Sequence, residues 1–385
     1  MALKESPSPS TRRYDIDWLR ILAVLLLVPF HGALVFVQNP SSVVYLKDTL
    51  DSFYLDRMDG FIDQFHMPIL FIIAGMSTYF ALGKRSAGQY LRERVLRLVI
   101  PLLFGITVLV PPMTYLTQVA KGNPPTFWQH YANFFTIGPD LTGRSGTFTP
   151  AHLWFILYLI VFSLVALGLF LLLRRSGSQG FVKSLAWFFE KPLTLLLLVI
   201  LLALGKAIDI LDNLNPIYFF LYFVFGYLLM TDACYQKAID RDWPVMLVLG
   251  VIFEVMRQTW HPNFTEWSLP WILHEMAMHL NRWVWVLAIL GIGHRLLNRR
   301  GKALSYLTEA AYPIYIIHFL VLTIVSYFIV KIQAAIAVKY LLIVCLTFAV
   351  IFLVYEGVRR LPPLRFLLGM KPSRQPKSSS EKQII

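Results

Sequence analysis

Residues 17–31 read DWLRILAVLLLVPFH, an apolar run with an arginine near its start and a histidine at its end. An α-helix turns ~100° per residue, so the eleven residues from Arg20 to His31 bring the two side chains to within about 20° of each other, ~16 Å apart along the axis. Both polar groups therefore share one helix face. Ionisable side chains at membrane depth are costly and usually line a cavity or pathway, so we predict a functional site on this face.

The composition is typical of a membrane protein. Of 385 residues, 57% are hydrophobic and 15% are charged, and the mean hydropathy is +0.61. The first apolar run follows a polar, basic start and lacks a small-residue cleavage site, so we expect a retained anchor and not a removable signal peptide. The net charge of +13 fits membrane topology and attraction to anionic lipid headgroups, and does not by itself indicate nucleic-acid binding.

Ten segments are apolar and long enough, at roughly 20 residues each, to cross ~30 Å of hydrocarbon. They lie near 19–37, 61–83, 97–117, 152–173, 192–208, 216–231, 244–258, 282–297, 311–330 and 337–358. The segment 244–258 is short, so nine spans is the main alternative. We therefore predict an all-α, polytopic integral membrane protein with about ten transmembrane helices.

The basic residues predict the orientation. With the N-terminus inside, the inner loops and tails collect most of the lysines and arginines, including Arg12, Arg85, Arg174, Arg299 and Arg359. Both termini are then cytoplasmic. The predicted organisation is a cytoplasmic segment 1–18, a single transmembrane domain 19–358 with outer loops 118–151 and 259–281, and a basic, disordered cytoplasmic tail 359–385.

The two outer loops are rich in aromatic residues and histidines, which fits either an aromatic belt at headgroup level or ring faces for stacking on a sugar. One stretch has nearly, but not fully, the spacing of a zinc-binding motif. His274 and His279 are five residues apart, not four, so a His-Glu-x-x-His zinc site is not formed. We predict no metal.

Five stretches resemble, in order, those of the acyltransferase-3 family of polytopic membrane enzymes. They are the Arg20-to-His31 spacing after YDID at 14–17, FHMPILFIIAG at 65–75, RVLR at 94–97, HLWFI at 152–156 and SYLTEAAYPIYIIH at 305–318. Ala74 stands where the family commonly has serine. The last stretch is similar to a glucan-succinylating branch of the family. The matched motifs span residues 14–318, which is most of the chain.

The resemblance implies transfer of an acyl group from a cytoplasmic acyl-CoA to a hydroxyl of a glycan on the outer side of a bacterial inner membrane. It favours succinyl-CoA with a linear or cyclic glucan, followed by acetyl-CoA with a surface polysaccharide or lipid-linked sugar. The expected partners are membrane lipids and the glycan acceptor, with no nucleic acid. The oligomeric state is left open.

Three arginines are candidates for binding the donor. Arg94 and Arg97 are three residues apart and so share a helix face at the cytoplasmic surface, where planar guanidinium groups suit the phosphates of a CoA-like molecule. Arg20 is expected at the same inner level. Positive-inside anchoring is the alternative for the pair, and snorkelling or pairing with Asp17 is the alternative for Arg20.

His31 is the leading catalytic candidate. Acyl transfer to a hydroxyl needs a base near neutral pH, and an imidazole suits that role. Direct base catalysis and a transient acyl-histidine both remain open, as does a packing role. His66 is expected at about the depth of His31, where it either meets His31 across a cleft or caps its helix.

Glu309 and His318 are further catalytic candidates, but nine residues place them half a turn out of phase, so one of them serves structure unless Pro313 bends the helix. We expect Glu309 near the cytoplasmic headgroups and His318 facing the cavity. His152, Trp154 and Tyr312 are expected to bind substrate, with an interfacial aromatic belt as the default for the first two.

Two other classes compete with a membrane O-acyltransferase. Ten helices with intramembrane charge also describe a transporter or flippase for a saccharide or a lipid-linked intermediate, although the two halves show no repeat. A non-catalytic scaffold would not need histidine and arginine on inward faces. We therefore expect an enzyme.

Overall fold

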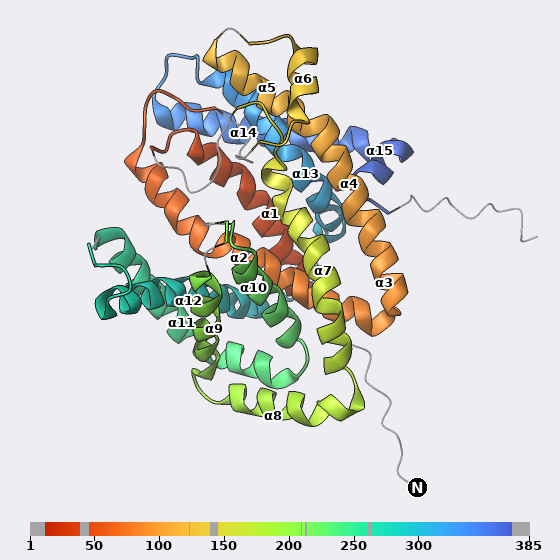
Figure 1. Ribbon diagram of the computed structural model, residues 1–385, viewed down its shortest axis with the longest axis vertical. Coiled ribbons are helices and arrows are strands. Elements are labelled where there is room, and N and C mark those ends of the chain that lie inside the picture. Colours follow the sequence, from red (N-terminus) through yellow and green to blue (C-terminus); the bar gives the residue numbers. More distant parts are fainter. Residues whose placement is uncertain are drawn as a thin grey trace, which may run out of the picture. The chain divides into compact units, whose positions relative to one another are not determined.

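The computed structural model describes residues 12–38, 46–122, 124–138, 145–208, 210–211, 214–260 and 263–371. Helices dominate these residues and no strand occurs among them (Figure 1), which confirms the predicted all-α class. The α-helices are α1 (Tyr14–Leu34), α2 (Phe53–Lys84), α3 (Ala87–Arg94), α4 (Ile100–Phe104), α5 (Val110–Lys121), α6 (Phe127–Phe134), α7 (Trp154–Leu173), α8 (Gln179–Glu190), α9 (Leu198–Ala207), α10 (Pro216–Leu228), α11 (Ala233–Thr259), α12 (Leu269–Leu297), α13 (Leu304–Ile329), α14 (Ile336–Val358) and α15 (Pro362–Leu367). Residues 372–385, most of the predicted tail, lie outside the described residues, as do residues 1–11.

Seven helical stretches within the described ranges are long and apolar enough to cross a membrane, and the number rises to nine if two bent helix pairs are each one span. The pairs are 176–190 with 194–207, bent by 112°, and 216–228 with 233–259, bent by 108°. The sequence predicted ten spans because 216–231 and 244–258 were counted separately. In the structure these segments belong to α10 and α11, which meet at the second bend.

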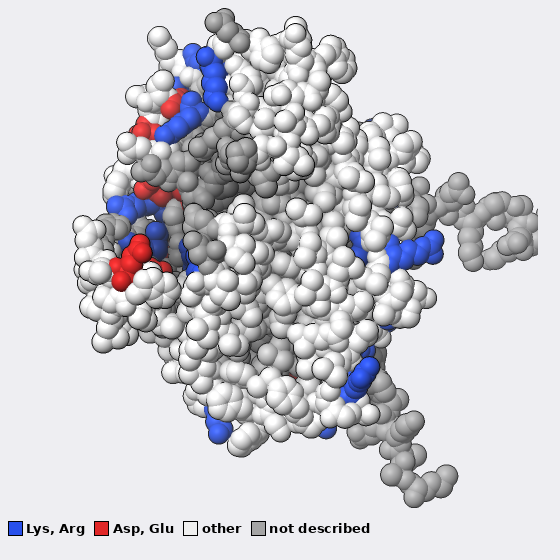
Figure 2. Space-filling model, in the orientation of Figure 1, with Lys and Arg blue, Asp and Glu red and all other residues white. Residues whose placement is uncertain are grey.

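Large apolar side chains face outward, as they do in a protein solvated by lipid. On α14, Leu341 is 58% exposed and Leu353 is 73% exposed; on α11, Ile252 is 55% exposed. Most of the face in Figure 2 carries no charged side chain. Soluble proteins seldom expose apolar surface on this scale, so the chain is a multi-pass membrane protein.

Two π-helical turns interrupt the stretch from α3 to α5. They are η1 (Val95–Val99) and η2 (Gly105–Leu109), and each ends shortly before a proline, Pro101 or Pro111. A proline ring collides with the carbonyl four residues earlier and has no N–H to offer it, so the helix widens locally. The first of these turns carries Arg97, one of the predicted donor-binding residues.

The chain divides into two compact units. The first comprises Met1–Ala23, Gly60–Lys84 and Val165–Thr308, and the second comprises Val24–Asp59, Arg85–Leu164 and Glu309–Ile385. In the first unit, the backbones of α2 and α10 are in direct contact. A β-carbon at Gly75 would lie 2.0 Å from the carbonyl oxygen of Phe223, and one at Gly226 would lie 2.0 Å from that of Ile72. Small residues at such crossings are common in membrane helices.

We expect Gly226→Ala to destabilise the protein by about 1–3 kcal/mol or more, because the added methyl group forces α2 and α10 apart. Gly168→Ala is the matched control. Gly168 also lies on a helix, but a β-carbon there meets no described atom within 4 Å, so alanine should be neutral or slightly stabilising. Thermal unfolding in detergent measures both variants; equal midpoints would contradict the close contact.

Candidate active site

Three histidines from three helical segments of the second unit lie together. His31 is on α1, His152 is on the short 3₁₀ turn η3 (Ala151–Leu153) that begins α7, and His318 is on α13. Their exposed fractions are 6%, 8% and 0%. The ring of His318 stacks on that of His31 with centroids 5.3 Å apart, and the ring of His152 meets His318 edge-on at 5.1 Å. The sequence placed these residues 121 and 166 positions apart along the chain, so only the fold brings them together.

The hydrogen bonds of His318 assign the protons of the histidine pair. Its Nδ1 lies 2.6 Å from the backbone oxygen of Tyr315, which can only accept, so this nitrogen carries a proton. In the neutral ring, Nε2 of His318 is then an acceptor, and Nδ1 of His31 donates to it across 3.2 Å. Nε2 of His31 therefore keeps its lone pair. A partner that fixes the tautomer in this way is a common feature of catalytic histidines.

His152 is held on α13 at two points. Its Nε2 donates to the backbone oxygen of Ile316 across 3.0 Å, and the Tyr315 hydroxyl donates to the backbone oxygen of His152. The preceding Ala151 has a φ of +46°, in the left-handed region that residues with a side chain seldom adopt. Its N–H donates to Thr149 Oγ1 across 3.0 Å. This strained turn fixes His152 against α13, and strain of this kind is common near functional sites.

Aromatic rings enclose the histidine pair. Phe319 stacks on His31 with centroids 4.5 Å apart and lies 5.3 Å from His152. The ring of Phe30, the preceding residue, lies 5.1 Å from that of His31. The apolar walls exclude bulk water and hold the imidazoles in place.

One face of α13 links the histidines to the predicted donor-binding arginines. Tyr312, Tyr315 and His318 follow at three-residue intervals, so each is about 60° around the helix from the next and Tyr315 lies between the other two. The rings of the two tyrosines are stacked with centroids 6.5 Å apart. Arg94 and Arg97 both interact electrostatically with the Tyr312 hydroxyl, which is buried and has no hydrogen-bond partner in the described part of the chain.

The two arginines are positioned differently. The guanidinium of Arg94 lies over the ring of Tyr90, 5.0 Å from its centroid. Nε of Arg97 donates to the backbone oxygen of Gly369 across 3.4 Å. Gly369 has a φ of +66°, and a β-carbon there would lie 2.7 Å from the ring of Tyr312. Glycine is therefore required where the chain after α15 closes over Arg97 and Tyr312.

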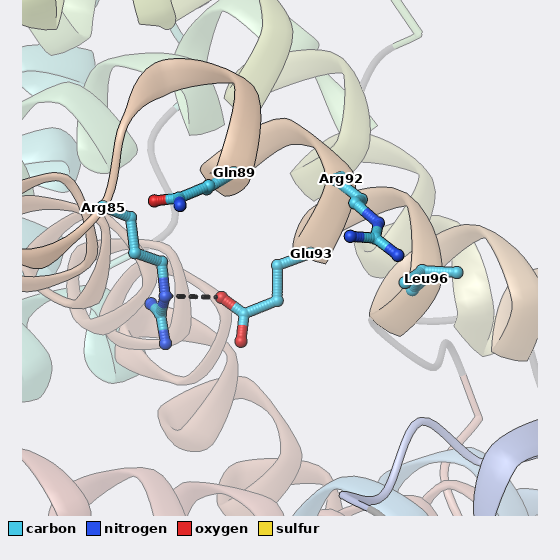
Figure 3. A pocket seen from close by; sticks show the side chains of 5 residues that line it. All are labelled: Arg85, Gln89, Arg92, Glu93 and Leu96. Carbon is cyan, nitrogen blue, oxygen red and sulfur yellow. Dashed lines mark ion pairs between the residues drawn. The ribbon is translucent and has the colours of Figure 1, made fainter.

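An open pocket of about 400 Å³ lies on the same helical stretch (Figure 3). It is lined by Arg85, Gln89, Arg92, Glu93 and Leu96. Arg85 and Glu93 form an ion pair at 3.0 Å, drawn as a dashed line in Figure 3, which leaves Arg92 as the lining cation outside that pair. The pocket is contiguous in sequence with Arg94 and Arg97.

The remaining predicted residues lie elsewhere. Glu309 forms an ion pair with Arg365 of α15 at 2.8 Å, and so is engaged outside the histidine cluster. Arg20 belongs to the first unit, where it donates to Ser77 Oγ across 2.7 Å and pairs with Asp17 at 3.3 Å.

His66 also belongs to the first unit, and its Nε2 donates to the backbone oxygen of Ala23 across 2.7 Å. Trp154 is half-buried on α7 and meets the ring of Tyr158 edge-on at 5.1 Å.

Sequence reasoning missed Tyr315 and Phe319. Their spacing from Tyr312 and His318 on α13 could have indicated a common face. It also expected His152 to bind substrate and did not predict its contact with His318. Among the described residues, no group of three or more His, Cys, Asp or Glu side chains is arranged to hold a metal ion.

The model of the acyltransferase domain of the acyltransferase-3 family matches residues 13–356. Glucans biosynthesis protein C of Shigella dysenteriae serotype 1 (strain Sd197) is 24% identical over 396 residues, covering 95% of this chain and 97% of the relative. The protein of the same name from Escherichia coli (strain K12) gives the same identity and coverage. No solved structure matches the chain.

A helical membrane fold with buried histidines, matched over nearly its whole length by an acyltransferase model, defines a membrane enzyme that transfers acyl groups. The chain belongs to the acyltransferase-3 family and is an O-acyltransferase. Both the resemblance seen in the five motifs and the predicted enzyme class are confirmed.

Proposed function

We propose that this protein moves an acyl group from a cytoplasmic acyl-CoA to a hydroxyl of a glycan on the outer side of a bacterial inner membrane, with His31 as the reacting imidazole. The observation that carries the proposal is the hydrogen bond from Nδ1 of His31 to Nε2 of His318. This bond leaves Nε2 of His31 as the basic nitrogen, and it fixes the orientation of the imidazole ring from the Nδ1 side. The names of the two relatives support a glucan as acceptor.

The proposed reaction balances as a proton transfer coupled to acyl transfer. Nε2 of His31 takes the proton from the acceptor hydroxyl while the oxygen attacks the thioester carbonyl. The resulting imidazolium is stabilised by its Nδ1–H bond to His318, much as a carboxylate does in a serine hydrolase. Collapse of the tetrahedral intermediate expels CoA thiolate, which takes the proton back from His31 and leaves as the thiol.

A two-step alternative uses the same atoms. Nε2 of His31 attacks the thioester and CoA thiolate leaves; the acceptor hydroxyl then attacks the acyl-imidazole, its proton passes to the thiolate, and Nε2 of His31 regains its lone pair. The enclosing rings of Phe30 and Phe319 would protect that intermediate from water. Mass spectrometry of quenched enzyme distinguishes the two routes, because only the second adds an acyl mass at His31.

The donor is proposed to extend along α13. Phosphate groups on Arg94 and Arg97 would place the pantetheine arm beside Tyr312 and Tyr315 and the thioester near the histidine pair. Tyr312 and His318 are six residues apart, which is ~9 Å along the helix. This span suits an extended arm between a charged head and a reactive end. The pocket of Figure 3 offers further room and the charge of Arg92 beside the arginine pair.

We expect Arg97→Gln to raise KM for the acyl-CoA by about 10- to 100-fold, because a charge-assisted contact to phosphate is lost. The turnover at saturating donor should change little, since the histidine pair is untouched. Arg175→Gln, at the connection after α7, controls for the loss of one basic residue. A lower turnover with unchanged KM would contradict donor binding at Arg97.

The function is tested with radiolabelled succinyl-CoA and acetyl-CoA. Each is incubated with extracted glycans and membranes that contain or lack this protein. Label that reaches glycan only when the protein is present supports the proposal and identifies the donor. Equal label with and without the protein, across both donors, would overturn the proposed glycan acceptor.

A further inference from the structure

A second polar cluster lies in the first unit, on residues that the proposed reaction does not use. Arg282 on α12 donates from Nη2 to Oδ2 of Asp63 across 3.4 Å and from Nε to Oε1 of Gln64 across 3.3 Å. Gln64 in turn donates to the backbone oxygen of Gly60 across 2.9 Å. A carboxylate, an amide and a guanidinium thus converge within two helices of the membrane domain, where such groups commonly mark a functional site.

Helix α10 contributes the hydroxyl groups of this cluster. The hydroxyls of Tyr218 and Tyr222 are 3.1 Å apart, and the ring of Tyr218 lies 5.5 Å from that of His279. Tyr218 also interacts with the guanidinium of Arg282. His279 is 5% exposed, and its Nδ1 has no partner among the described residues. A buried, unmatched ring nitrogen costs free energy unless a ligand or water completes it.

The ion pair of Arg257 and Glu254, in the same unit, serves as a comparison because its contacts are those of an ordinary structural pair. Arg257 donates two hydrogen bonds, of 2.7 and 3.0 Å, to the carboxylate of Glu254. The side-chain amides of Gln258 and Asn281 donate to the same carboxylate. These lengths are normal for a charge-assisted pair. The bonds from Arg282 to Asp63 and Gln64, at 3.4 and 3.3 Å, are longer than these.

Exposure separates the carboxylates of the two pairs as well. The side chains of Arg282 and Asp63 are 26% and 35% exposed, whereas those of Arg257 and Glu254 are 23% and 11% exposed. The carboxylate of Asp63 is therefore much more accessible than that of Glu254. Long bonds together with a more accessible carboxylate indicate a site that binds something beyond its own residues.

From this contrast we infer that Arg282, Asp63 and Gln64 form a binding site for the sugar hydroxyls of the glycan acceptor. The inference rests on the function proposed above and names where that function takes its acceptor. Each sugar hydroxyl both donates and accepts; Asp63 supplies acceptors, Arg282 supplies donors and Gln64 supplies both. These donors and acceptors together match a neutral polyol; because Arg257 and Lys206 also act electrostatically on Asp63, competition by an anion is one outcome of the test below.

The position of the cluster fits an acceptor from outside. Asp63 lies in the first half of α2, Tyr218 near the start of α10 and Arg282 in the first half of α12. These parts adjoin the connections 35–52, 208–215 and 260–268. In the orientation that the basic residues favour, the first two of these connections are on the outer side.

The test measures the kinetics of acyl transfer to a neutral glucohexaose. We expect Arg282→Lys to raise KM for the glucohexaose by about 10- to 100-fold while KM for the acyl-CoA stays unchanged, because lysine keeps the charge but loses the planar donor fork. Asp63→Asn should likewise raise KM for the glucohexaose and leave KM for the acyl-CoA unchanged. Arg241→Lys, whose guanidinium pairs with Asp242 at 2.7 Å in the first half of α11, is the control and should leave both KM values unchanged.

Direct binding separates this inference from the proposed function. Calorimetry of the detergent-solubilised protein should show that His31→Ala still binds the glucohexaose although it no longer transfers, whereas Arg282→Lys binds weakly with an unchanged unfolding midpoint. Unchanged glucohexaose binding and KM in Arg282→Lys would overturn the inference while leaving the acyl transfer intact. Displacement of the sugar by inorganic phosphate, or no binding to the intact protein, would also overturn it.

Discussion

Replacing His31 with alanine is expected to lower the rate of acyl transfer by about 10²- to 10⁴-fold, the usual contribution of a positioned base. The loss should fall on kcat, with KM for the acyl-CoA nearly constant, because Arg94 and Arg97 are unaffected. If His31 is instead acylated, the loss should be larger, since no intermediate can form. Initial rates with purified protein and labelled donor measure the effect.

His318 provides the graded control for this prediction. We expect His318→Ala to cost about 10- to 100-fold, because His31 loses the acceptor that fixes its tautomer while its own Nε2 remains. His318→Gln should recover part of the rate, since an amide oxygen can accept the Nδ1–H of His31. Equal losses in the alanine and glutamine variants would show that His318 does not act through this hydrogen bond. Full activity of His31→Ala would remove His31 from the chemistry.

The second large effect is expected at a buried ion pair in the second unit. Nζ of Lys339 at the start of α14 donates to Oδ2 of Asp48 across 2.7 Å, and the two side chains are only 7% and 2% exposed. The N–H of Asp48 donates to the backbone oxygen of Val35, one residue past α1, across 2.9 Å. The pair therefore fixes the connection after α1, four residues beyond His31.

Lys339→Met should destabilise the protein by about 3–5 kcal/mol, because it leaves the Asp48 carboxylate buried without its counter-charge. Adding Asp48→Asn removes the stranded charge and keeps an acceptor for the N–H of Leu50, which Oδ1 of Asp48 now binds at 3.0 Å. The double variant should therefore be more stable than Lys339→Met alone. Thermal unfolding of both variants measures the difference; additive losses would contradict coupling between the two side chains.

The fold class and the family followed from local sequence features. Hydropathy alone predicts the helices, because a membrane span must be both long and apolar. The first predicted span forms helix α1, which runs unbroken from Tyr14 to Leu34 despite Pro29. The exact division into spans did not follow, since hydropathy does not reveal the bend between α10 and α11.

The candidate site could be predicted only in part, because its contacts join distant segments. His31 and His318 were both singled out from sequence, but their hydrogen bond crosses 287 residues. The phase argument that separated Glu309 from His318 agrees with their different partners, Arg365 and His31. Asp63 was overlooked although it is a carboxylate inside a predicted span, a feature that by itself indicates a functional site.

The account is tested most directly in sealed vesicles that contain the purified protein, with labelled acyl-CoA inside and glucan outside. We predict that label appears on the external glucan with the intact protein and falls to background with His31→Ala, although the variant has an unchanged unfolding midpoint. Label on the external glucan at equal rates with both proteins would contradict the central claim that acyl transfer takes place at the His31–His318 pair.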